Sequence, residues 1–276
     1  MSPSASPREL AGGKLLVDEP CAGVVRLTIS NPEKRNALDH PILDAITATL
    51  TELTAGANDG VRCVTITGAR GMFSAGYDIG ELPGEEFEQR AERLVAHPFT
   101  EAIEALEAYP YPTLAALSGH TIGGGLELAL ACDLRVAKDD IKLGMPPAKL
   151  GLVYSHTGMR RFIDTVGAAR TRELFLLGRY VDAPTALGWG LVNRVVAATE
   201  LEEVALELAG ELAGNAPLSQ TGNKRVIAAL LHAEGELSDE VERELIALRA
   251  ASFASQDMRE GMRAFAEKRT PSWRGE

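Results

Sequence analysis

The chain has 276 residues, of which 45% are hydrophobic, and this length suits one large domain with a sizeable core. Its formal net charge of -11 opposes binding to nucleic acid or to an anionic membrane surface, because both carry negative charge. Three cysteines without C-x-x-C spacing (Cys21, Cys63 and Cys132) argue against a disulfide framework or a zinc site. We therefore expect no metal, no membrane association and a cytoplasmic location.

The predicted elements begin after residues 1–13, which are rich in Ser, Pro and Gly and are expected to form a disordered tail. Alternating or β-branched runs predict strands over residues 24–29, 61–67, 113–117, 133–137 and 141–145. Helices are predicted over residues 41–53 and 84–108, the second interrupted at Pro98, and then over 200–213, 217–231, 238–255 and 257–268. This order predicts a mixed core over residues 14–199 and a helical C-terminal region over 200–276.

Residues 119–132 place a glycine-rich turn directly before an apolar helix that carries one charge, Glu127. Glycines let backbone N–H groups approach a ligand, and the first turn of a helix leaves those donors unpaired beside a partial positive charge. The segment therefore predicts an anion-binding site. Glu127 follows Gly124 by three residues, so its carboxylate is expected on the same helix face. The alternative is an ordinary helix start whose carboxylate reaches the surface.

A second glycine-bearing loop, Met-Phe-Ser-Ala-Gly-Tyr-Asp-Ile over residues 72–79, follows the strand predicted over 61–67. Two backbone donors from two loops are the minimum for an oxyanion hole, which stabilises negative charge that develops on a carbonyl oxygen. The glycine spacing is not G-x-G-x-x-G, and no P-loop or G-x-S-x-G motif is present. These features argue against a nicotinamide enzyme and a serine hydrolase.

Four motifs in register resemble the crotonase superfamily, also called the enoyl-CoA hydratase/isomerase family. They are residues 31–38 (Asn-Pro-Glu-Lys-Arg-Asn-Ala-Leu), 73–78 (Phe-Ser-Ala-Gly-Tyr-Asp), 123–129 (Gly-Gly-Gly-Leu-Glu-Leu-Ala) and 132–135 (Cys-Asp-Leu-Arg). Later landmarks extend the resemblance over most of the chain. It implies an α/β fold, the crotonase (ClpP-like) spiral of ββα repeats, whose C-terminal helices form a homotrimer or a dimer of trimers.

The same resemblance implies a coenzyme A thioester as substrate, without a separate cofactor. Its carbonyl oxygen would lie between the N–H groups of Tyr77 and Gly124. Arg35 and Lys268 are the candidates for binding the coenzyme A phosphates, and the alternative for each is an ordinary solvated charge. The family pattern places the remaining coenzyme A contacts at Ala37, Ala75, Asp78, Ile79 and Gly123.

Pro147 stands where hydratases of this family carry a second glutamate, so two carboxylates cannot position one water here. Isomerases of the family use an acid near the same place. Loss of carbon dioxide from a malonyl-type thioester forms an enolate without a base. Residues 78–83 and 145–151 resemble the methylmalonyl-CoA decarboxylases of the family, and Tyr154 matches a tyrosine of their pattern, which could orient the scissile carboxylate. Tyr77 departs from that pattern, which has His there.

The leading hypothesis is a crotonase-fold lyase that decarboxylates a methylmalonyl- or malonyl-type CoA thioester, with Tyr77, Gly124, Glu127 and Tyr154 as catalytic residues. One alternative is an enoyl-CoA hydratase or isomerase that acts with Glu127 alone or recruits Glu81. Another is a non-catalytic acyl-CoA binder. Glu127 either orients water, delivers a proton through water, or serves as a structural acid, and Tyr154 is either functional or a packing residue.

Overall fold

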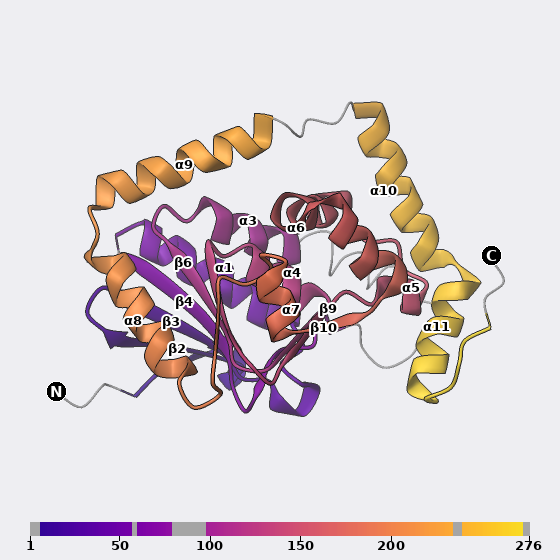
Figure 1. Cartoon of the computed structure of the whole chain (residues 1–276), viewed down its shortest axis with the longest axis horizontal. Coiled ribbons are helices and arrows are strands. Elements are labelled where there is room, and N and C mark those ends of the chain that lie inside the picture. The colour runs from indigo at the N-terminus through magenta and orange to yellow at the C-terminus, as the bar shows by residue number, and fades with distance from the viewer. Residues whose placement is uncertain (1–5, 57–59, 79–97, 234–238, 273–276) are drawn as a thin grey trace.

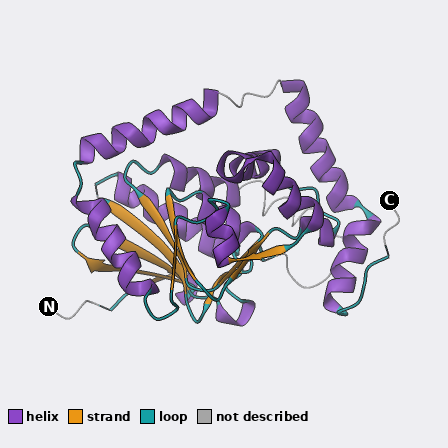
Figure 2. Ribbon diagram, in the orientation of Figure 1, coloured by secondary structure: helices purple, strands orange, loops and turns teal. Residues whose placement is uncertain are grey.

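The computed structural model describes residues 6–56, 60–78, 98–233 and 239–272, and its helices surround two sheets (Figures 1 and 2). Within these residues a seven-stranded sheet has the order β1-β2-β3-β4-β6-β8-β11, and a four-stranded sheet has the order β10-β9-β7-β5. The strands are β1 (Arg8–Leu10), β2 (Leu15–Cys21), β3 (Val24–Ile29), β4 (Cys63–Gly68), β5 (Met72–Ser74), β6 (Thr113–Leu117), β7 (His120–Ile122), β8 (Leu134–Lys138), β9 (Lys142–Gly144), β10 (Tyr180–Asp182) and β11 (Arg194–Val196).

The helices described are α1 (His40–Thr54), α3 (Thr100–Ala108), α4 (Gly124–Leu130), α5 (Pro147–Leu150), α6 (His156–Leu177), α7 (Ala183–Gly188), α8 (Leu201–Gly214), α9 (Pro217–Ala233), α10 (Asp239–Ala254) and α11 (Gln256–Ala266). Two 3₁₀ turns, η1 (Ala11–Gly13) and η2 (Pro32–Lys34), accompany them. No helix among the described residues is both long and apolar enough to cross a membrane.

From β4 onward the chain alternates between the two sheets. Strands β4, β6 and β8 lie in the large sheet, and each is followed by a strand of the small sheet, β5, β7 and β9 respectively. All neighbouring strands in these repeats are parallel. In the large sheet β4 pairs with β6 and β6 with β8, and in the small sheet β5 pairs with β7 and β7 with β9. Each repeat therefore adds one strand to each sheet and then a helix, which confirms the expected spiral of ββα repeats.

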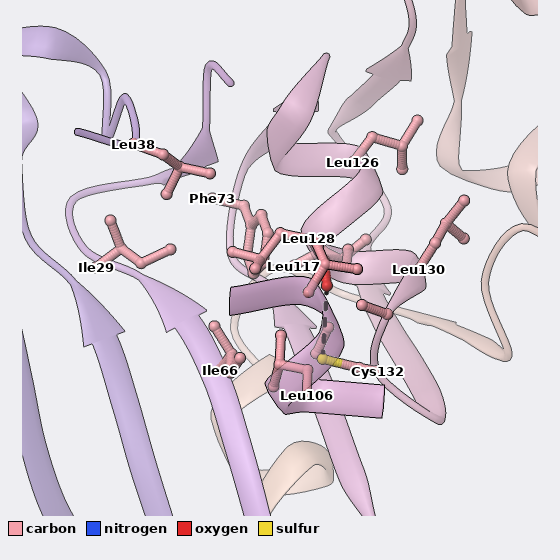
Figure 3. Close-up of a cluster of buried hydrophobic side chains, with 14 of the residues drawn as sticks. Ile29, Leu38, Ile66, Phe73, Leu106, Leu117, Leu126, Leu128, Leu130 and Cys132 are labelled. Carbon is pink, nitrogen blue, oxygen red and sulfur yellow. Dashed lines mark hydrogen bonds between the residues drawn. The ribbon is translucent and has the colours of Figure 1, made fainter. Parts of the chain in front are cut away.

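The large sheet is covered by apolar side chains on both faces, and alternate residues of its strands point to opposite sides. Ile66 of β4 and Leu117 of β6 lie in the main core beside Phe73 (Figure 3). Cys63 and Leu114 of the same strands point the other way and pack beneath α8. They contact apolar residues of that helix, namely Leu201, Ala205, Leu208 and Ala209. Burial on both faces explains the continuous apolar runs of these strands.

The N-terminal segment differs from its prediction. Residues 6–13 of the expected disordered tail are described, and Arg8–Leu10 pair antiparallel with Leu15–Val17. An ion pair of 2.9 Å joins Arg8 to Glu52. The expectation of disorder is therefore wrong for this part, because backbone pairing at a sheet edge orders a segment that buries little apolar surface.

The C-terminal region also differs in part from its prediction. Helix α8 packs on the large sheet, so the core extends beyond residue 199. Helix α11 returns to the body of the molecule, where Met258 and Met262 pack with Phe253, Leu150 and Tyr77. The predicted helical content from residue 200 onward is confirmed, but part of it covers the core and the neighbourhood of Tyr77.

Several elements have no counterpart in the sequence prediction. Strands β5, β7, β10 and β11 have three residues each, too few to show a period. Helix α6 is bent at Gly167, whose φ of 74° is not helical, so its apolar pattern is broken into two short halves. The helix predicted over 84–108 is confirmed for Thr100–Ala108, and residues 84–97 lie outside the described residues.

Candidate active site

Helix α4 begins where strand β7 ends, and a left-handed residue makes this turn. Gly123 has φ 57°, a conformation that favours glycine. Its carbonyl oxygen accepts hydrogen bonds from the N–H groups of Leu126 and Glu127 at 2.9 and 3.2 Å. Gly124 is the first residue of α4, and the N–H groups of a first helical turn have no acceptor within their helix. The turn thus supplies the kind of donor that the sequence predicts.

The loop after β5 lies against this turn. Strands β5 and β7 are parallel neighbours, so their carboxyl ends lie at the same edge of the small sheet. Gly76, in this loop, has φ 97°, and a Cβ there would lie 3.0 Å from both the nitrogen of Gly124 and the oxygen of Ile122. Only glycine combines this backbone conformation with this close contact. The two predicted loops therefore meet at Gly76 and Gly124.

Tyr77 follows at the point where the two loops meet. The N–H of Leu38 donates to the carbonyl oxygen of Gly76 at 2.8 Å, and the N–H of Asp78 donates to the carbonyl oxygen of Leu38 at 2.9 Å. In such an extended pairing the intervening N–H, that of Tyr77, points away from Leu38. The Tyr77 ring lies against Gly124, where a Cβ would be 2.8 Å from its Cε1 atom. The same ring also meets Phe99 edge-on, with the ring centroids 4.4 Å apart.

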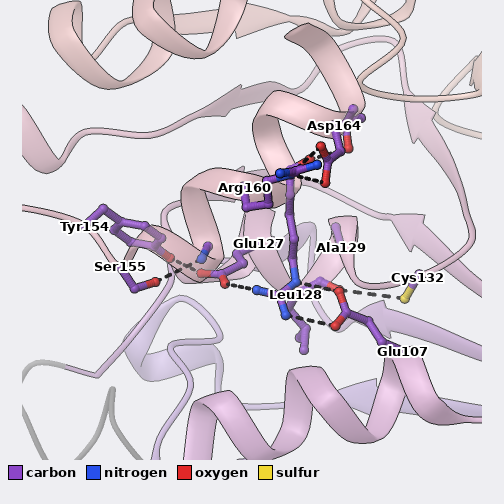
Figure 4. Close-up of polar contacts among 12 residues, drawn as sticks. Glu107, Glu127, Leu128, Ala129, Cys132, Tyr154, Ser155, Arg160 and Asp164 are labelled. Carbon is purple, nitrogen blue, oxygen red and sulfur yellow. Dashed lines mark hydrogen bonds and ion pairs between the residues drawn. The ribbon is translucent and has the colours of Figure 1, made fainter. Parts of the chain in front are cut away.

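Glu127, on the first turns of α4, is buried in a cluster of polar side chains with only 2% of its surface exposed. The hydroxyl of Tyr154 donates a hydrogen bond to Oε2 of Glu127 (Figure 4). The hydroxyl of Tyr77 lies 3.4 Å from the same oxygen and 3.1 Å from the hydroxyl of Tyr154. Two phenols from different loops therefore meet at one carboxylate oxygen.

Arg161 of α6 forms an ion pair with the other carboxylate oxygen of Glu127. Its Nη1 atom lies 3.2 Å from Oε1 of Glu127. Its Nε and Nη2 atoms donate to Glu107 of α3 at 2.5 and 2.9 Å. The guanidinium is thus held between a buried and a half-exposed carboxylate, and it provides the positive charge that a buried carboxylate requires.

The environment sets the protonation of these groups. Burial raises the pKa of Glu127, while the charge of Arg161 and the hydrogen bonds from Tyr154 and Tyr77 lower it. Burial and the nearby carboxylate raise the pKa of Tyr154 well above its usual value. Tyr154 is therefore a neutral phenol with one hydrogen to donate. The cluster can store, hold or pass a proton.

Comparison with known proteins places this geometry in a family. The family described as enoyl-CoA hydratase/isomerase matches residues 19–276. The chain belongs to this family. A probable enoyl-CoA hydratase of Bacillus subtilis (strain 168) is 37% identical over 256 residues, which cover 92% of this chain and 96% of that protein. A carnitinyl-CoA dehydratase of Proteus mirabilis (strain HI4320) is 36% identical over 226 residues, covering 78% and 82% respectively.

Solved structures of the family share the fold. Methylmalonyl-CoA decarboxylase complexed with 2S-carboxypropyl CoA superposes with a TM-score of 0.85 at 29% identity, covering 95% of this chain and 98% of that one. A carnitinyl-CoA hydratase from Mycobacterium avium has a TM-score of 0.79 at 33% identity, covering 95% and 99%. The crotonase fold is therefore confirmed. Because these enzymes are named for different reactions, the reaction of this chain must be argued from its site.

The third loop at this edge of the small sheet contains no carboxylate at position 147. Pro147 is buried and is the first residue of α5, after Pro146 at the N-cap position. Proline suits the first helical position because the N–H that it lacks would have no helical acceptor. It has no group that transfers a proton. Glu127 is thus without a partner acid at the position where the family's hydratases carry one.

The structure brings some of the predicted coenzyme A residues to the two loops. The carbonyl oxygen of Arg35 accepts a hydrogen bond from the N–H of Ala75 at 3.1 Å, and Ala37 is buried nearby in the same segment. Asp78 forms an ion pair of 2.7 Å with Lys34. Lys268 is exposed beyond the end of α11. Ile79 and the alternative acid Glu81 lie outside the described residues.

Sequence reasoning missed Arg161 and Glu107. A buried carboxylate predicts a cationic partner, but the sequence offers 28 lysines and arginines and no local pattern that selects one. For Tyr77 the sequence predicted a role only for the backbone N–H and left the role of the side chain open. Its position directly after Gly76, in a glycine-bearing loop, is the signal that pointed to this residue.

Replacing Glu127 by glutamine tests the effect of burial on its pKa. Since the folded pKa is raised, the folded state holds the proton more tightly than the unfolded chain. This contribution to stability is complete below the ordinary carboxyl range and is lost as the pH rises through the folded pKa. We expect the free energy of unfolding of wild type, minus that of Glu127→Gln, to fall as the pH rises above the ordinary carboxyl range of about pH 4.

Denaturant unfolding at several pH values provides the measurement. Glu104→Gln, which changes an exposed carboxylate of α3 in the same way, is the control. A difference that rises with pH for Glu127→Gln would mean that its hydrogen bonds outweigh burial.

Proposed function

We propose that this protein decarboxylates a malonyl-type thioester of coenzyme A, such as methylmalonyl-CoA or malonyl-CoA. In this proposal the thioester oxygen lies between the N–H groups of Tyr77 and Gly124. The observation that carries the proposal is that both oxygens of Glu127 already have partners in the protein, Arg161 at Oε1 and the two phenols at Oε2.

Hydration would require a carboxylate that can hold and deprotonate a water molecule. Glu127 would have to give up a partner to do so, in a place where an unpaired charge is costly. Pro147 offers no second carboxylate to share the water. The arrangement therefore favours a reaction that does not begin with proton abstraction.

Decarboxylation is such a reaction. The bond between C2 and the carboxylate breaks, its electron pair passes into the thioester to form an enolate, and carbon dioxide leaves. The two N–H groups stabilise the enolate oxygen. A substrate carboxylate in this buried site is unfavourable as an anion because it loses its water, whereas neutral carbon dioxide is not. C2 then accepts one proton.

Similarity to solved methylmalonyl-CoA decarboxylases supports this proposal. The names of the curated relatives favour a second candidate, an enoyl-CoA hydratase or isomerase that acts with Glu127. A third candidate is a protein that binds acyl-CoA without turnover, and this role would need only the two glycine-bearing loops. In each case the coenzyme A contacts are assigned to Arg35, Ala37, Ala75, Asp78, Ile79, Gly123 and Lys268, with no separate cofactor.

The substrate class separates these candidates. We expect purified protein to release carbon dioxide from methylmalonyl-CoA or malonyl-CoA and to hydrate crotonyl-CoA slowly or not at all, because Pro147 supplies no second carboxylate to hold a water beside Glu127. Mass spectrometry of the thioester products provides the measurement. Rapid hydration of crotonyl-CoA without carbon dioxide from either malonyl-type thioester would establish the second candidate instead.

Gly124→Pro and Gly124→Ala form a matched pair for the oxyanion hole. Both place a Cβ against the Tyr77 ring, but only proline removes the N–H. Loss of one such donor costs about a hundredfold to a thousandfold in rate, so we expect Gly124→Pro to be slower than Gly124→Ala by this factor. The measurement is kcat, with circular dichroism to verify folding. Equal rates for the two folded variants would remove Gly124 from the hole.

Tyr154→Phe tests whether the second phenol is functional or only packed. It removes the hydrogen bond between the Tyr154 hydroxyl and the carboxylate of Glu127. A hydrogen bond to a charged group is worth about 1.5 to 3 kcal/mol, so the rate of decarboxylation should fall by about tenfold to a hundredfold. KM for the thioester should change little. Tyr180→Phe, at a half-exposed tyrosine of β10, is the control. Wild-type kcat in Tyr154→Phe would show that Tyr154 serves only in packing.

We also propose that the protein forms a trimer or a dimer of trimers, as the family resemblance implies. Helix α9, along the upper edge in Figure 1, exposes apolar side chains that a partner subunit would cover, among them Leu218, Val226, Ile227, Leu230 and Leu231. The proposed interface also includes Val241, Leu245 and Leu248, which stand at helical spacing in the sequence, and the side chains of these three residues lie outside the described residues. Light scattering should give a multiple of 29.4 kDa, and a monomer mass would contradict the proposal.

A further inference from the structure

The side-chain oxygen atoms of Glu127, Tyr154 and Tyr77 form a line of hydrogen-bonded groups, and the burial of the side chains decreases along this line. Glu127 is 2% exposed, Tyr154 is 7% exposed, and Tyr77 is only partly buried. The line has short steps, since the Tyr154 hydroxyl is hydrogen-bonded to Oε2 of Glu127 and lies 3.1 Å from the hydroxyl of Tyr77. Tyr77 is therefore the member of the line that lies nearest to solvent, and so to a substrate that enters the site.

The ring of Tyr77 is fixed beside the proposed oxyanion hole. It lies against Gly124 and meets Phe99 edge-on. It is also inclined by only 23° to the ring of Tyr154, with the centroids 6.4 Å apart. In the substrate, C2 is bonded to the carbonyl carbon whose oxygen would occupy the hole. The Tyr77 hydroxyl and C2 would thus share the space next to Gly124.

Resting on the proposed function, we infer that the Tyr77 hydroxyl donates the proton that C2 of the enolate accepts, and that Tyr154 and Glu127 restore this proton. The O–H bond of Tyr77 breaks as the C–H bond forms. The Tyr77 oxygen takes the hydroxyl proton of Tyr154, which takes the proton of Glu127 in its acid form. Glu127 recovers one proton from solvent before the next turnover. One proton is consumed for each carbon dioxide released, as the reaction requires.

The surroundings of Glu127 suit this role. Arg161 engages Oε1, so Oε2 is the oxygen that faces the phenols. Burial raises the pKa of Glu127 and favours its acid form. Phe175 meets the ring of Tyr154 edge-on at 5.5 Å and fixes the middle member of the line. In this role Glu127 and Tyr154 act through Tyr77, which alone touches the reacting carbon.

Decarboxylation of methylmalonyl-CoA in deuterium oxide tests the inference, because the propionyl-CoA product then carries deuterium at a chiral C2. Tyr77→Phe keeps the ring, its packing and the backbone N–H, and it removes only the hydroxyl. We expect wild type and the control Tyr180→Phe to give one configuration at C2. Tyr77→Phe should give both configurations, with a rate lowered by about a hundredfold or more. A single configuration from Tyr77→Phe would overturn the inference, since a packing role does not affect which face is protonated.

A second measurement does not depend on decarboxylation. By microscopic reversibility the same line of oxygens removes a C2 proton from propionyl-CoA, so wild type should exchange that hydrogen with deuterium oxide, as followed by mass over hours. Tyr77→Phe should exchange at least about a hundredfold more slowly. If wild type releases no carbon dioxide, the proposed function fails and this exchange alone decides the inference. No exchange by wild type, or equal exchange by the variant, would overturn it.

Discussion

A carboxylate buried in the core is the constraint on which the rest of the site depends. A charge at Glu127 is stable there only if protein groups replace the water that it has lost. Arg161 of α6 does so on one side, and it is itself held by Glu107 of α3. Tyr154 and Tyr77 do so on the other side. The positions of three helices and two loops are thus tied to a single ionisable group, and loss of any partner makes the charged form of that group less stable.

The repeats of the fold explain why the functional loops lie together. Strands β5, β7 and β9 are parallel neighbours, so three successive repeats deliver their following loops to one edge of the small sheet. The first loop contributes Tyr77, the second Gly124, and the third Pro147. The family fold therefore offers one position in each repeat for the chemistry. In this chain the third position is occupied by Pro147, which has no proton to transfer, and among the described residues Tyr77 and Tyr154 are the phenols that contact Glu127.

Sequence predicts the parts of this site that are encoded locally. The glycines at 76 and 123–125 signal their turns because few other residues adopt such backbones or allow such contacts. The contact between Arg161 and Glu127 spans 34 residues, and no local pattern announces it. Tyr154 could be recognised as a candidate, but its hydrogen bond to Glu127 depends on how α6 packs against α4. The pairing of Arg8–Leu10 with β2 likewise depends on a partner strand rather than on the segment's own residues.

The packing of α11 has a consequence for the order in which the protein becomes complete. Phe253, Met258 and Met262 lie against Tyr77, which the ribosome makes much earlier. Glu260 then holds the segment that follows α11, because Arg263, Arg269 and the N–H of Ser272 all donate to its carboxylate. During translation the loop of Tyr77 emerges without this cover, and it gains the cover only after α11 has left the exit tunnel. The synthesis of α11, rather than the folding of the core alone, completes the surroundings of the loop that contains Tyr77.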